Sequence, residues 1–126
     1  MDALPRLDTV AAASALFAPL ADSRVERAAA AFLDPQWRLL GRHDTLGGDD
    51  AVMPSIRDLV RQALRLDAAR LILAHNHPSG NPEPSPADLA FTRTLARVLA
   101  PLEIALVDHL IVTPSAITSL RDRGLL

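Results

Sequence analysis

The chain contains no cysteine, and this absence removes several kinds of chemistry together. Disulfides, cysteine-ligated zinc, iron–sulfur clusters and thiol nucleophiles all need the thiol that only cysteine supplies. Any transition-metal site must therefore use histidine, aspartate and glutamate side chains. A zinc nucleobase deaminase, which needs a Pro-Cys-x-x-Cys motif, is excluded, and the His-Glu-x-x-His helix of another protease class is also missing from the sequence.

Aromatic side chains are scarce and positive charge is not in excess. Tyrosine is absent, aromatic residues make up 3% of the chain, and 13 lysine and arginine residues stand against 15 acidic ones, for a net charge of −2. Binding to nucleic acid needs clustered cations for the phosphates and, for single strands, aromatic rings for the bases. We therefore do not expect direct DNA binding.

Long hydrophobic runs are also missing. No segment approaches the roughly 20 apolar residues of a membrane helix, and the N-terminal segment, interrupted by Arg6 and Asp8, lacks the charge order of a signal peptide. The 126 residues, 49% of them hydrophobic, suit one domain with one core. We expect a soluble cytoplasmic protein with no contact to membranes.

The N-terminal half predicts one helix and one hairpin. The alanine-rich segment Thr9 to Leu20 favours a short helix that is capped by Thr9 and ends before Pro19. Asp34-Pro35 is typical of a turn between two strands, Val25 to Leu33 and Trp37 to His43. Because four consecutive alanines favour helix, a helix remains the alternative for the first half of this hairpin.

The C-terminal half alternates helix and strand, which indicates an α/β sandwich. Apolar residues at helical spacing predict helices, and short apolar runs predict buried strands. The expected order is a helix over Pro54 to Leu66, a strand over Ala69 to Ala74, a helix over Ser85 to Ala100 that stops at Pro101, a strand over Glu103 to Val112, and a short helix or turn over Pro114 to Leu126.

The segment LILAHNHPSGNPEPSPAD, residues 71 to 88, carries the strongest chemical signal. On a strand, residues i and i+2 project from the same face, so His75 and His77 can chelate one ion. The loop that follows can return the chain so that Asp88, in the first turn of the next helix, supplies a third ligand. Two imidazoles and one carboxylate are a ligand set of catalytic zinc that leaves one position for water.

Helix capping is the alternative interpretation of the same residues. Ser85-Pro86-Ala87-Asp88 has a serine at the N-cap, a proline at the first helical position and an acid at the third. Asp88 taken alone is more typical of a capping residue than of a metal ligand. The two roles are compatible, because a capping carboxylate can also face a metal.

The string His75-Asn76-His77-Pro78-Ser79-Gly80, followed by Pro84-Ser85 and Asp88, resembles the JAMM motif of the JAB/MPN metalloprotease superfamily, and every fixed position is filled. Residues 22 to 124 look most like the RadC-like branch, with residues 1 to 21 as an additional N-terminal helix and no room for the helix-hairpin-helix region of that branch. The resemblance implies a single-domain α/β/α sandwich with a mixed β-sheet, the cytidine-deaminase-like fold.

The resemblance also implies the roles of individual residues. It places Zn²⁺ on His75, His77 and Asp88, a general base on Glu26, and stabilisation of the reaction's oxyanion on Ser85. Glu26 is chosen by its offset from the strand that ends at Phe32-Leu33-Asp34. Without the resemblance, Glu26 is more typical of a solvated glutamate, and a helix over residues 25 to 33 would misplace it.

Asp108 and His109 form a second pair of interest. Neighbours on a strand point to opposite faces, so at most one of them can support a zinc histidine from behind. A buried structural pair is an equally good interpretation.

The leading hypothesis is a zinc metallohydrolase of peptide or isopeptide bonds, whose protein or peptide substrate the sequence does not name. The alternative is a DNA-repair-associated accessory or protein-interaction module, and a metal-free scaffold is disfavoured because the ligands are intact. Substrate choice is expected to depend on loops 43–54 and 78–85 and on a homodimer surface.

Overall fold

Five strands form one twisted sheet in the order β2-β1-β3-β4-β5. The computed structural model describes residues 5–45 and 53–126. The strands are β1 (Ala28–Leu33), β2 (Leu39–Thr45), β3 (Arg70–Asn76), β4 (Ala105–Val112) and β5 (Ile117–Ser119). β1 pairs antiparallel with both β2 and β3, β3 pairs parallel with β4, and β5 pairs antiparallel with β4. The predicted mixed sheet is confirmed.

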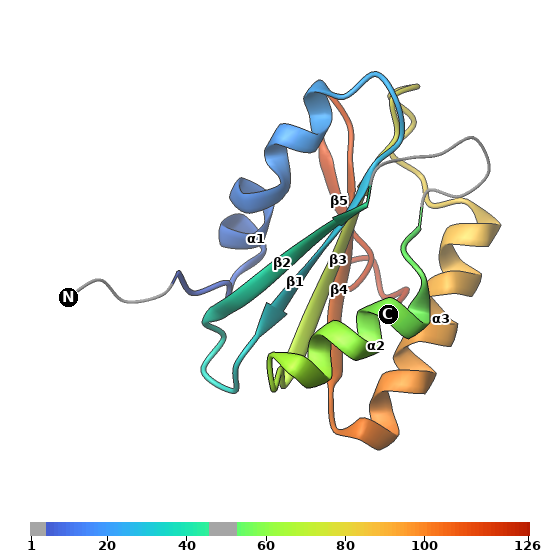
Figure 1. The fold of residues 1–126 in the computed structure, drawn as a ribbon. Coiled ribbons are helices and arrows are strands. Elements are labelled where there is room, and N and C mark those ends of the chain that lie inside the picture. Colours follow the sequence, from blue (N-terminus) through green and yellow to red (C-terminus); the bar gives the residue numbers. More distant parts are fainter. Residues whose placement is uncertain (1–4, 46–52) are drawn as a thin grey trace.

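Helices cover both faces of the sheet (Figure 1). α1 (Val10–Phe17) and the 3-10 turn η1 (Ala18–Asp22) pack on one face, whereas α2 (Ile56–Arg65) and α3 (Pro86–Leu99), followed by the 3-10 turn η2 (Ala100–Leu102), pack on the other. Two apolar clusters fill the two interfaces because buried side chains alternate between faces along each strand. The α/β/α sandwich is therefore confirmed.

The helices begin within two residues of the predicted positions, and α2 begins at Ile56 rather than at Pro54 because Ser55 is its N-cap. Thr9, Ser55 and Ser85 each accept a backbone N–H with the side-chain hydroxyl at the start of α1, α2 and α3. α1 ends at Phe17, before Pro19, and α3 ends at Leu99, before Pro101. Among the described residues, none of the helices is long and apolar enough to cross a membrane.

The hairpin of β1 and β2 is confirmed, and the helical alternative for its first half is wrong. All six residues of β1 are buried, because the strand lies between two neighbours and under helices on both faces. β1 starts at Ala28, later than the expected Val25, so Glu26 lies just before the strand. Residues 46–52, within the loop 43–54 singled out for substrate choice, lie outside the described residues.

The C-terminal prediction is wrong in part. In place of a short helix, residues 117–119 form β5, and turns follow to residue 124. β5 is only three residues long, and it forms because Leu110, Ile111 and Val112 of β4 offer it a buried edge to pair with.

Two leucines on α2 test the assignment of the core. Leu59 is fully buried, whereas Leu64 is 57% exposed on the same helix. Leu59→Ala should lower the free energy of unfolding by about 2–5 kcal/mol through lost burial and a residual cavity. Leu64→Ala, the matched control, should change it by about 0.5 kcal/mol or less. Urea denaturation measures both, and equal losses would contradict this packing of α2.

Candidate metal centre

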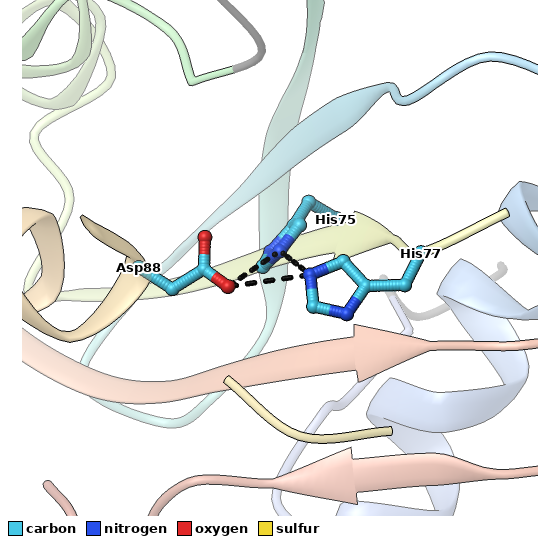
Figure 2. A group of neighbouring side chains, drawn as sticks. All are labelled: His75, His77 and Asp88. Atoms are coloured by element: carbon cyan, nitrogen blue, oxygen red, sulfur yellow. Dashed lines mark hydrogen bonds and ion pairs between the residues drawn. The ribbon is translucent and has the colours of Figure 1, made fainter. Parts of the chain in front are cut away.

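Three ligand atoms converge at the end of β3 (Figure 2). His75 Nε2 lies 2.9 Å from His77 Nε2, and Asp88 Oδ2 lies 3.3 Å from His75 Nε2 and 3.2 Å from His77 Nε2. Zinc bonds of about 2.0–2.1 Å at tetrahedral angles separate ligand atoms by about 3.3 Å, close to these three edges. The donor set and its dimensions therefore fit a divalent metal ion.

β3 and the turn after it orient the two histidines. His75 is the penultimate residue of β3, and the His77 N–H continues the sheet by donating to Val112 O at 2.9 Å. Gly80 then adopts φ +85°, a conformation that favours glycine, in a turn closed by its N–H on His77 O. The turn brings Asn81 O to 2.8 Å from His77 Nδ1, so that Nδ1 donates its proton there and Nε2 keeps its lone pair for a metal.

Asp88 caps α3 and at the same time faces the two histidines, the position that both of its interpretations require. Its Oδ2 accepts the Ser85 N–H at 2.8 Å, its own N–H donates to Ser85 Oγ at 3.0 Å, and the same Oδ2 faces the two histidines. Burial raises the pKa of the Asp88 carboxyl, but the close approach of His75 and the hydrogen bonds with Ser85 outweigh it, so the pKa lies well below its usual range. The capping box therefore presents an ionised carboxylate to the metal position.

His75 is supported from behind by His109. His75 Nδ1 lies 2.7 Å from His109 Nε2, and both side chains are buried. Asp108 lies on the opposite face of β4, where it accepts the Ser119 hydroxyl and the Arg121 N–H. Of the two interpretations left open for this pair, His109 takes the supporting position and Asp108 the structural one.

Glu26 and Ser85 line the same cleft, which borders the metal centre. The cleft has a volume of about 850 Å³, and His77 and Asp88 contribute to its wall. The His75 side chain is only 2% exposed, whereas those of His77 and Asp88 are each 12% exposed, so the centre opens toward the cleft. The predicted residues are thus brought together, with Glu26 on an irregular segment rather than on the expected strand.

Asn76 holds the segment that carries Glu26, and the sequence pattern does not single it out. Its buried side chain accepts the Arg27 N–H at 2.6 Å and donates to Val25 O at 3.0 Å and Ser23 O at 3.3 Å. These bonds fasten the backbone on both sides of Glu26 to the end of β3. The only sequence signal was its position between the two histidines, which on a strand turns the Asn76 side chain to the opposite side.

The comparisons with known proteins identify the family of the chain. A family model described as RadC-like JAB domain matches residues 7–125, a range that includes α1. The chain therefore belongs to the RadC-like JAB domain family.

Curated relatives support the same assignment. A UPF0758 protein of Bordetella avium is 50% identical over 111 residues, which cover 85% of this chain and 48% of that protein. A UPF0758 protein of Thermosynechococcus vestitus is 43% identical over 112 residues, 88% of this chain and 45% of that protein. The chain thus spans about half the length of the curated relatives it matches.

Acid should destabilise the metal-free protein through His109. Burial, reinforced by repulsion from His75, lowers the pKa of His109 from 6.5 to about 3. Between these values the unfolded chain binds a proton that the folded protein does not, so stability falls as the pH drops below about 6.5. At about 1.4 kcal/mol per pH unit, the loss from His109 between pH 6.5 and 5 is about 2 kcal/mol.

Urea denaturation of the metal-free protein at pH 7 and pH 5 measures this loss. His109→Gln should lose less stability on acidification than the wild-type chain, because glutamine has no proton to gain. His43→Gln, on β2, is the control that retains the full contribution of His109. An equal pH dependence in all three proteins would show that His109 is not buried in its neutral form.

Proposed function

We propose that this domain is a zinc-dependent hydrolase of peptide or isopeptide bonds. The observation that carries the proposal is that three atoms able to bind a metal meet at the wall of a cleft that a separate carboxylate, Glu26, also lines. Catalytic zinc sites use three protein ligands and keep one position open, whereas structural sites close all four. Membership of a JAB domain family, which includes metalloproteases, agrees with this reading.

His75 Nε2, His77 Nε2 and Asp88 Oδ2 would hold the ion. Zinc bound there would supply a Lewis acid able to polarise the scissile carbonyl and to make water more acidic. The N and O ligand set is consistent with zinc, and the absence of thiolates leaves the ion's positive charge less neutralised than a cysteine-rich site would.

Glu26 and Ser85 act on either side of the attacked carbonyl. The Glu26 carboxylate accepts the proton of the attacking water and delivers it to the leaving amine nitrogen. Ser85 Oγ accepts the Asp88 N–H through a lone pair, so the capping bond does not use the hydroxyl proton of Ser85. That proton can be donated to the oxyanion that forms on the substrate carbonyl.

The walls of the cleft suit a polypeptide. Apolar side chains of Met53, Pro84, Pro86 and Phe91 line it beside the polar loop residues Ser79 and Asn81. Glu83, also in the wall, pairs with Arg123 at 2.8 Å and ties the loop to the C-terminal segment. Apolar surface with a few polar groups is typical of sites that take a substrate side chain and orient its backbone.

Glu26→Gln tests the proposal. The probe is a library of linear and lysine-branched peptides incubated with the zinc-loaded protein, with new termini detected by mass spectrometry. The wild-type chain should cleave, and Glu26→Gln should be slower by about 10²–10⁴-fold, because glutamine cannot accept the proton. Both proteins should bind equal zinc.

Glu103→Gln is the matched control, because Glu103 precedes β4 and does not line the cleft. It should cleave as the wild-type chain does. No zinc-dependent cleavage by the wild-type chain would contradict the hydrolase, and equal rates in the wild type and Glu26→Gln would remove Glu26 from the mechanism.

A further inference from the structure

A buried chain of hydrogen bonds runs from one metal ligand to the backbone of another. His75 Nδ1 and His109 Nε2 are 2.7 Å apart, His109 Nδ1 and Thr92 Oγ1 are 2.6 Å apart, and Thr92 Oγ1 donates to Asp88 O at 2.7 Å. All three residues, His75, His109 and Thr92, are buried. The chain therefore connects β3, β4 and α3 behind the metal centre, on the side away from the cleft.

The last acceptor decides the direction of every bond in this chain. A backbone carbonyl only accepts, so Asp88 O takes the single hydroxyl proton of Thr92. Thr92 Oγ1 must then accept the proton of His109 Nδ1. Neutral His109 has only one ring proton, so its Nε2 is bare and accepts from His75 Nδ1.

These bond directions also determine the protonation of His75 Nε2. With its proton on Nδ1, His75 presents a lone pair on Nε2, the atom that faces His77 and Asp88. This tautomer is the one that can bind a metal there. Reversal of the chain would put a proton on His75 Nε2 and block the site.

A β-bulge in β4 places His109 in this position. Leu71 pairs with Leu106 and Ile72 with Asp108, so Val107 is one extra residue in β4. Leu106 packs on the α2 and α3 face and Val107 on the α1 face. Without the extra residue, simple alternation would turn Asp108 toward the metal and His109 away from it. Bulges that re-aim a side chain in this way are common next to functional sites.

We propose that His109 and Thr92 are positioning residues of the metal centre, which hold His75 in the Nδ1–H tautomer before the metal arrives. Most zinc-bound histidines donate a hydrogen bond to a carboxylate or a carbonyl. Here the acceptor is the neutral imidazole of His109, which in turn donates to Thr92, and Thr92 donates to Asp88 O. The proposal rests on the proposed metal centre and assigns to these two residues a role that the ligands and Glu26 do not share.

Zinc affinity tests the role of the hydrogen bonds. Competition with a fluorescent chelator should give a zinc dissociation constant about 10–100-fold higher for His109→Leu and Thr92→Val than for the wild-type chain. His109→Gln and Thr92→Ser should restore affinity, because a glutamine amide can accept from His75 and donate to Thr92. Ser119→Ala, which disturbs the buried Asp108 on the opposite face of β4, should leave affinity unchanged.

Imidazole ¹⁵N spectra of the metal-free protein test the tautomers directly. The chain has four histidines, so single substitutions can assign each ring. We expect His109 and His75 to carry their protons on Nδ1, and we expect Thr92→Val to mix the two tautomers of His109. A proton on His109 Nε2 in the wild type, or unchanged zinc affinity in His109→Leu, would overturn the proposal. Failure of the wild type to bind zinc would instead contradict the metal centre, whatever the tautomers.

Discussion

The convergence of three electron-pair donors at the end of β3 is the constraint on which the site depends. Two imidazole nitrogens and a carboxylate oxygen within about 3.3 Å of one another repel unless a cation lies between them. The protein must therefore hold each donor from behind. It does so with one hydrogen bond per ligand, from His75 to His109, from His77 to Asn81 O, and from the Ser85 N–H to Asp88.

The fold supplies these three contacts, and a further one that holds the segment of Glu26, from different places around the sheet. Parallel pairing of β3 with β4 brings His109 behind His75, the turn at Gly80 brings Asn81 O back to His77, and the N-terminal cap of α3 aims Asp88. On the remaining side, Asn76 fastens the segment that carries Glu26. The candidate ligands are thus fixed mainly by secondary structure, while Glu26 and residues of the loop 78–85 line the open cleft beside them. This division suits a site that must be rigid at the metal and adaptable at the cleft.

Local patterns predicted the parts of the site that local chemistry determines. The spacing of His75 and His77 and the capping box at Ser85 and Asp88 involve neighbours in sequence, and in the structure the capping Asp88 also faces the two histidines. Long-range contacts were harder to predict. Alternation alone could not decide between Asp108 and His109, because the bulge at Val107 changes the face of every residue after it. The position of Glu26 depends on Asn76, 49 residues beyond Arg27, and β5 forms only because β4 offers an edge.

Anomalous X-ray scattering at the zinc edge, on crystals of the tag-free protein grown with stoichiometric zinc, would locate the ion. We expect one peak bonded to His75 Nε2, His77 Nε2 and Asp88 Oδ2, on the side that faces Glu26. Zinc bound elsewhere, or no peak with Asp88 serving only the Ser85 cap, would contradict the proposed metal centre.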